Sequence, residues 1–127
     1  MTAWKPPGYN SASPYLVCTD AKATLEFLVA AFDAERLRYL VRPDGKVNHA
    51  EARIDDTVIM VSDEADTWLP VPAHVHIYVK DVDATYTRAL KAGAISVMAP
   101  AKKDDGDQRG GVRDPGGTTW WIATQRG

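Results

Sequence analysis

The chain of 127 residues contains a single cysteine, Cys18, so it cannot form an internal disulfide. It also lacks an excess of either charge: 15 basic and 17 acidic residues give a formal net charge of -2. That balance gives no excess of positive charge that would attract nucleic acid or an anionic membrane surface. No apolar run approaches the roughly 20 residues of a spanning helix, and the N-terminus lacks the layout of a signal peptide. These absences predict a cytoplasmic protein without a nucleic-acid or membrane partner.

The remaining composition is that of an ordinary globular protein, with 45% hydrophobic and 25% charged residues. A chain of this length can bury one hydrophobic core without help from disulfides or a structural metal. We therefore expect a single domain over residues 1–127.

One stretch, residues 74–79, begins a pattern that occurs twice in the chain. Its two histidines and its tyrosine alternate with aliphatic residues, which places them together on one face of a strand. Asp81 follows at a position suited to cap a helix. The same arrangement occurs 61 residues earlier, ending at Asp20.

The rest of each copy follows the same plan. In the first copy a strand is followed by a helix with an apolar stripe, and turn residues then separate three strands. The expected elements are strand 12–18, a helix from Asp20 to near Asp33, and strands 35–42, 46–54 and 57–61. In the second copy they are strand 74–79, a helix from Asp81 to a capping Gly93, strand 95–98, a charged loop 99–106, a short strand before the turn at Asp114, and strand 118–124.

Adding 61 to a residue number in the first copy leads to the equivalent helix cap, turn or strand start in the second copy. Asp20 falls on Asp81, Asp44 on Asp105, and Thr57 on Thr118. The fold class predicted is α+β, with two tandem βαβββ modules at about 12–63 and 73–125, joined by a linker at 64–72. Residues 1–11 read as an extended arm whose aromatic side chains dock on the domain or on a partner subunit.

Two tandem βαβββ modules of this length resemble the vicinal oxygen chelate superfamily, which includes glyoxalases, bleomycin-resistance proteins and ring-cleaving dioxygenases. Residues 106–115 and 119–124 are similar to the signature of its PhnB-like subgroup, and residues 49–51 and 79–84 fit the same subgroup. The resemblance implies a curled eight-stranded cup with the helices outside, and usually a homodimer. It implies no single reaction, because the fold hosts enzymes and plain binding proteins.

The resemblance also locates a metal site, at four positions occupied here by Ser13, Met60, His74 and Trp121. Only His74 binds a divalent metal well, because a serine hydroxyl is a poor ligand, a thioether is too soft and an indole offers no lone pair. We expect no metal and no cofactor. An atypical site remains open as an alternative if His76, His49 and Glu51 meet His74.

The leading hypothesis is a metal-independent protein that binds an aromatic or conjugated small molecule in the cup. The alternative is a lyase or isomerase that uses His74 or His49 as general base beside Glu51. A cup filled by its own side chains, in a structural or regulatory dimer, is a third possibility. The candidate ligand-binding residues are Tyr15, His49, Glu51, Met60, His74, His76, Trp121 and, at the mouth, Arg109.

Each candidate also has a purely structural interpretation. His49, Glu51 and Arg53 share a strand face and can form a salt-bridge ladder. Alternation and the repeat place Trp121 in the cup and Trp120 against the helices. Cys18 is expected to be a buried apolar filler, and Trp68 can close over the rim of the cup. The basic residues of the charged loop and of the strand after it can simply be solvated; they are Lys102, Lys103, Arg109 and Arg113.

Overall fold

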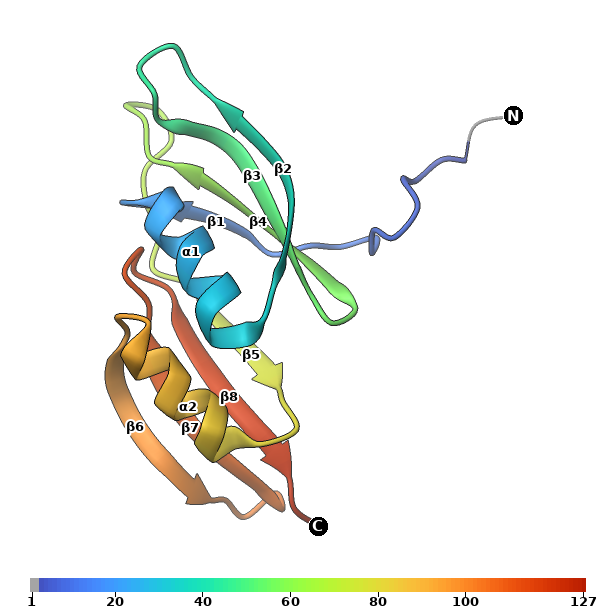
Figure 1. Ribbon diagram of the computed structural model, residues 1–127, viewed down its shortest axis with the longest axis vertical. Helices are drawn as coiled ribbons and strands as arrows, with labels where there is room; N and C mark the ends of the chain where they lie inside the picture. Colours follow the sequence, from blue (N-terminus) through green and yellow to red (C-terminus); the bar gives the residue numbers. More distant parts are fainter. Residues whose placement is uncertain (1–2) are drawn as a thin grey trace.

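The computed structural model describes residues 3–127 and shows the βαβββ pattern twice (Figure 1). The first module consists of β1 (Tyr15–Cys18), α1 (Ala21–Phe32), β2 (Glu35–Val41), β3 (Val47–Ile54) and β4 (Thr57–Asp63). The second consists of β5 (His74–Tyr78), α2 (Val82–Lys91), β6 (Ile95–Lys102), β7 (Asp107–Arg113) and β8 (Thr119–Gln125). The predicted fold class is confirmed.

Both helices begin where the sequence places a capping aspartate. The Asp20 side chain accepts a hydrogen bond from the Ala23 amide at 3.0 Å, and Asp81 accepts one from the Ala84 amide at 3.1 Å. Each bond satisfies a backbone donor that the first helical turn leaves without a partner. The two strand-to-helix corners are therefore built in the same way.

Eight strands form two four-stranded sheets, in the orders β1-β4-β3-β2 and β5-β8-β7-β6. The helices lie on the same side of the sheets, the near side in Figure 1, and contact each other. The opposite faces of the sheets form the inside of the cup. Neither helix of the described chain is long and apolar enough to cross a membrane.

The repeat holds with one correction. Tyr15 pairs with Met60 and His76 pairs with Trp121, so β1 and β4 map onto β5 and β8 by adding 61. However, Met60 also pairs with Glu51, whereas Trp121 pairs with Gly111, which is 60 residues after Glu51. The uniform offset of 61 is therefore wrong for the central strands β3 and β7.

A β-bulge causes this change of offset. Two adjacent residues of β2 pair with Val47 and His49 of β3, which are two positions apart. The bulge therefore places one extra residue in β3 between these two positions. The turn after β7 is one residue longer than the turn after β3, which restores the offset of 61 in β8.

The predicted loop at 99–106 is wrong over residues 99–102, because β6 continues to Lys102. The strand tolerates Pro100 because β6 lies at the edge of its sheet.

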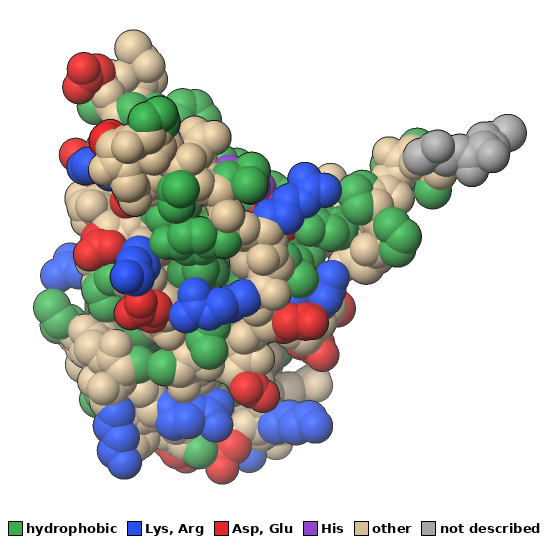
Figure 2. Space-filling model, turned by 45° about the horizontal axis from the view of Figure 1, so that its top comes forward, with side chains coloured by type: hydrophobic (Ala, Val, Ile, Leu, Met, Phe, Trp, Pro, Cys, Tyr) green, Lys and Arg blue, Asp and Glu red, His purple; other side chains and the backbone are tan. Residues whose placement is uncertain are grey.

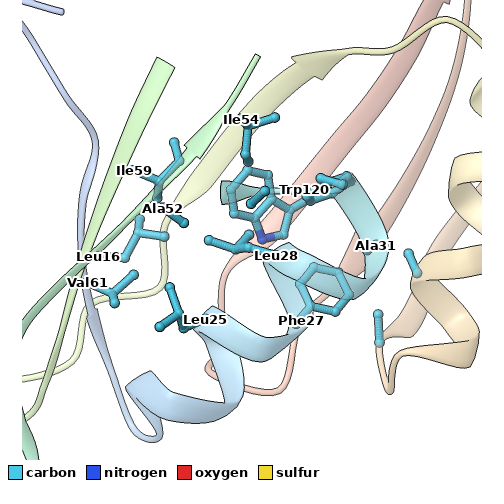
Figure 3. Packing of buried hydrophobic residues seen from close by; sticks show 14 of the residues in the cluster. Leu16, Leu25, Phe27, Leu28, Ala31, Ala52, Ile54, Ile59, Val61 and Trp120 are labelled. Atoms are coloured by element: carbon cyan, nitrogen blue, oxygen red, sulfur yellow. The ribbon is translucent and has the colours of Figure 1, made fainter. Parts of the chain in front are cut away.

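A hydrophobic core lies between the helices and the sheets and joins the modules. The indole of Trp120, from β8, is fully buried and packs 5.0 Å from the ring of Phe32 at the end of α1. Figure 3 shows it beside Leu28 and Ile54, which also belong to the first module. The expected position of Trp120 against the helices is confirmed.

Candidate functional site

A first polar cluster lies on the cup face of the first module and consists of Tyr9, Tyr15, His49, Glu51 and Trp68. The Tyr15 hydroxyl is 3.0 Å from His49 Nδ1, and His49 Nε2 is 2.7 Å from one Glu51 oxygen. The Tyr9 hydroxyl donates to the other Glu51 oxygen. Three side chains from β1, β3 and the N-terminal arm thus form a continuous hydrogen-bonded chain with the carboxylate.

Glu51 is only 1% exposed, yet it remains ionised. Burial acts to raise the pKa of its carboxyl, but the hydrogen bonds from Tyr9 and His49 outweigh burial and hold the pKa below its ordinary value. The bond to Glu51 likewise raises the pKa of the Tyr9 phenol, which keeps its proton as a donor. Because ionised Glu51 only accepts, His49 donates to it through Nε2, and the contact between His49 Nδ1 and the Tyr15 hydroxyl completes the chain.

A cavity of about 370 Å³ opens beside Tyr15 and His49. Trp68 lines its edge, with its ring perpendicular to Tyr15 at 6.0 Å and its indole N–H donating to Ser62 at 2.8 Å. Met60 pairs with Tyr15 and with Glu51 along the sheet. Trp68 thus packs against the aromatic edge of this cavity.

A second cluster lies on the cup face of the second module, and Trp121 is its largest member. The indole ring lies flat over Gly111: a Cβ on Gly111 would fall 2.6 Å from its Cζ3. The indole N–H donates to His74 Nδ1 at 3.0 Å, and the two rings are nearly parallel, with 5° between their planes. The sheet, Gly111 and His74 together hold Trp121 as a flat, partly exposed platform.

The same face carries an ionic network around Arg109. Its guanidinium donates to His76 Nε2 at 3.0 Å, to Asp105 at 3.0 Å and to Asp107 at 2.8 Å. The Tyr78 hydroxyl also donates to Asp107. Burial, and after it the charge of Arg109, lowers the pKa of His76, so this histidine is neutral at physiological pH. Two carboxylates already neutralise the charge of Arg109.

The corrected repeat shows how the two clusters correspond. Tyr15 and His49 map onto His76 and Arg109, and both pairs are joined by a hydrogen bond of 3.0 Å. Glu51 maps onto Gly111. Where the first module has a buried carboxylate, the second has a gap that the Trp121 ring covers.

The residues present do not fit the divalent metal that the resemblance suggests. Ser13 and Met60 stay poor ligands, and His74 Nδ1 already accepts the Trp121 N–H. Within residues 3–127, no group of three or more His, Cys, Asp or Glu side chains lies close enough to hold a metal ion. The atypical set is also split, because His49 and Glu51 meet in the first cluster while the other two histidines lie in the second.

The modules meet at a groove of about 360 Å³ between the β3–β4 turn and β5. Pro14 and Thr57 line it from the first module, and His76 and Tyr78 from the second.

Cys18 lies away from the cup. It is buried in the core, and burial raises the pKa of its thiol to about 11. Its prediction as a buried filler is confirmed.

Sequence reasoning missed Tyr9 as a site residue. The arm has no periodicity, and 42 residues separate Tyr9 from Glu51, so no spacing could have found the contact. Its docking was expected only in general terms. Tyr78 and Asp107, which complete the second cluster, were missed as well.

Comparison with known proteins gives the family. The model of the Glyoxalase/Bleomycin resistance protein/Dioxygenase superfamily matches residues 10–122. The chain belongs to this superfamily. An uncharacterized protein of Mycobacterium bovis is 40% identical over 121 residues, covering 87% of this chain and 80% of the relative.

Two solved structures show the same fold. TioX from Micromonospora sp. ML1 has a TM-score of 0.77 at 24% identity, covering 91% of this chain and 98% of TioX. The lactoylglutathione lyase from Agrobacterium tumefaciens has a TM-score of 0.67 at 21% identity, covering 96% and 97%. At such identities the likeness extends to the fold alone, so the function must be argued from the site.

Proposed function

We propose that this superfamily member is a metal-independent binding protein for a flat aromatic or conjugated small molecule. The observation that carries the proposal is the Trp121 platform, held flat over Gly111 and fixed at its N–H by His74. A rigid, partly exposed indole offers a large stacking surface that loses little conformational entropy when a ligand binds. The remaining candidates, Tyr15, His49, Glu51, Met60, His76 and Arg109, supply polar and apolar contacts in the cup.

The test is a fluorescence titration with acridine as a flat probe. Stacking on Trp121 should quench tryptophan emission, and Trp121→Ala should abolish the quenching. A matched control is Trp68→Phe, which removes the indole at the other cluster and should leave acridine binding unchanged. Equal quenching in the Trp121→Ala protein would refute the platform.

A second candidate function, proton transfer in a lyase or isomerase, is favoured by the chain from Tyr15 through His49 to Glu51. A buried carboxylate that orients a histidine, which in turn contacts a hydroxyl, is an arrangement suited to general acid–base catalysis. In this arrangement Tyr15 exchanges the proton with the substrate. His49 is the candidate base rather than His74, because His49 contacts Glu51 and His74 contacts Trp121.

The lyase from Agrobacterium tumefaciens suggests the first compound to try, lactoylglutathione. If the chain catalyses its conversion, His49→Ala and Tyr15→Phe should each lower kcat strongly, whereas His74→Ala should preserve it. Activity lost with His74 but retained without His49 would contradict this assignment.

Three further features stay proposals. Membership of the PhnB-like subgroup and a homodimer rest on the sequence resemblance, and a cytoplasmic location rests on the composition of the chain. The N-terminal arm supports the homodimer, because Trp4 is 84% exposed on a segment that projects from the body of the molecule (Figure 2). The face shown there mixes positive, negative and hydrophobic side chains. Sedimentation of the purified protein tests the oligomeric state directly.

A further inference from the structure

The segment Gly8–Asn10 lies over the cup face of the first module and is held by three contacts from β3 and β4. The Tyr9 hydroxyl donates to buried Glu51, the Arg53 guanidinium donates to the Gly8 carbonyl at 3.1 Å, and the Asn10 side chain accepts from the Val58 amide at 2.9 Å. The Arg38 guanidinium lies 5.9 Å from the centre of the Tyr9 ring. The phenol is therefore seated in a formed site with a charged acceptor at its end.

The second module has no such strap. The residue 61 positions after Tyr9 is Pro70, and its neighbours Leu69 and Val71 are 68% and 67% exposed. The repeat therefore does not require an aromatic side chain over the cup face, and the second cup face stays open at Trp121. Tyr9 is an addition peculiar to the first module.

We infer that the Glu51 site accepts the hydroxyl group of a phenolic ligand, and that Tyr9 occupies this position until such a ligand displaces it. This inference rests on the proposed small-molecule binding and names the class of ligand. A buried carboxylate that already takes one bond from His49 needs a second donor on its other oxygen. A neutral aromatic hydroxyl supplies that donor and a ring for the space beside Arg38. A phenolate would place two negative charges together and is rejected.

The arm can leave without unfolding the domain. Residues 3–14 contain no helix or strand, and the N-terminal arm projects from the body of the molecule (Figures 1 and 2). The exchange replaces one hydroxyl donor to Glu51 by another, so the carboxylate keeps its partners. The ring of the ligand can then extend from the first cup face.

The experiment compares 2-naphthol with 2-methoxynaphthalene, which has the same rings but no hydroxyl donor, by isothermal titration calorimetry. All proteins carry Trp121→Ala, so the proposed platform makes no contribution. Adding Tyr9→Ala should tighten 2-naphthol binding at least about tenfold, or about 1.4 kcal/mol. Binding of 2-methoxynaphthalene should not change, and Glu51→Gln should remove most of the gain. Tyr9→Phe is the matched control, because its ring still fills the site and should give no gain.

Two results would overturn the inference: no gain with Tyr9→Ala, or an equal gain for both naphthalenes, which would mean that the arm merely fills space. A second measurement uses the unaltered chain. Saturating 2-naphthol should shift the nuclear magnetic resonance signals of the His49 ring, which shares Glu51 with Tyr9, and unmoved signals would also overturn it. Because Trp121 is absent from the calorimetry, failure here is distinct from failure of the platform.

Discussion

Replacing Gly111 by alanine should displace the Trp121 platform while leaving the fold intact. The new Cβ would lie 2.6 Å from Cζ3 and 2.8 Å from Cε3 of the indole. Carbon atoms in contact sit about 3.5–4.0 Å apart, so the ring must move by roughly 1 Å. That movement stretches the 3.0 Å bond from the indole to His74 beyond hydrogen-bonding distance.

The magnitude follows from these losses. The hydrogen bond contributes about 1 kcal/mol, and the aromatic contact with His74 contributes a similar amount, about 1 kcal/mol. Alanine is better than glycine within a strand by roughly 0.5–1 kcal/mol, which offsets part of the loss. We therefore expect the free energy of unfolding to fall by only about 1 kcal/mol, while acridine binds about tenfold or more weakly.

The assay is urea denaturation followed by acridine titration of the same preparations. Gly110→Ala is the matched control, because its Cβ would point to the opposite face and meet Pro100 at 3.1 Å. It should alter stability and leave acridine affinity unchanged. If Gly111→Ala binds acridine as tightly as the unaltered protein, or if Gly110→Ala weakens binding equally, the platform argument fails.

Three further predictions concern buried groups. Asp114→Ala leaves the Trp120 indole N–H and the amides of Gly116 and Thr118 without their acceptor and should cost about 3 kcal/mol in urea denaturation; a loss below about 1 kcal/mol would contradict this. The pKa of the Glu51 carboxyl lies below its ordinary value in the folded protein, so its stabilising contribution is present at neutral pH and is lost as the pH falls through the folded pKa. The stability difference from Glu51→Gln should therefore shrink on acidification, and a constant difference would refute it. The buried Cys18 thiol, with its pKa about 11, should resist iodoacetamide at pH 8 until urea unfolds the chain, which mass spectrometry can follow; labelling of the native protein would show that the core opens there.

The fold was predictable because its determinants are local. Each capping aspartate acts on an amide three residues away, and strand alternation separates Trp120 from Trp121 without reference to distant contacts. The repeat then fixed which tryptophan belongs to the core. The shift to an offset of 60 could not be found this way, because the bulge in β3 and the longer turn after β7 compensate each other before β8 begins.

The candidate site was less predictable because it depends on tertiary contacts. His49 and Glu51 were expected on one face, but the bond to Glu51 from Tyr9 was not, because Tyr9 reaches it from an arm with no periodic pattern. The role of Gly111 was equally invisible, since only the pairing of β7 with β8 places it beneath Trp121. The sequence predicted which side chains carry polar or aromatic chemistry, but it did not predict which side chains they contact.

The position of Trp120 has a consequence for the stage of synthesis at which the core can form. This indole fills the space between α1 and the sheets, yet it belongs to β8, the last strand of the second module. During synthesis the first module leaves the ribosome with an apolar hollow at Phe32 and Leu28 that stays open until β8 follows. The two modules repeat one plan, but the core that they share closes only when β8 has been made.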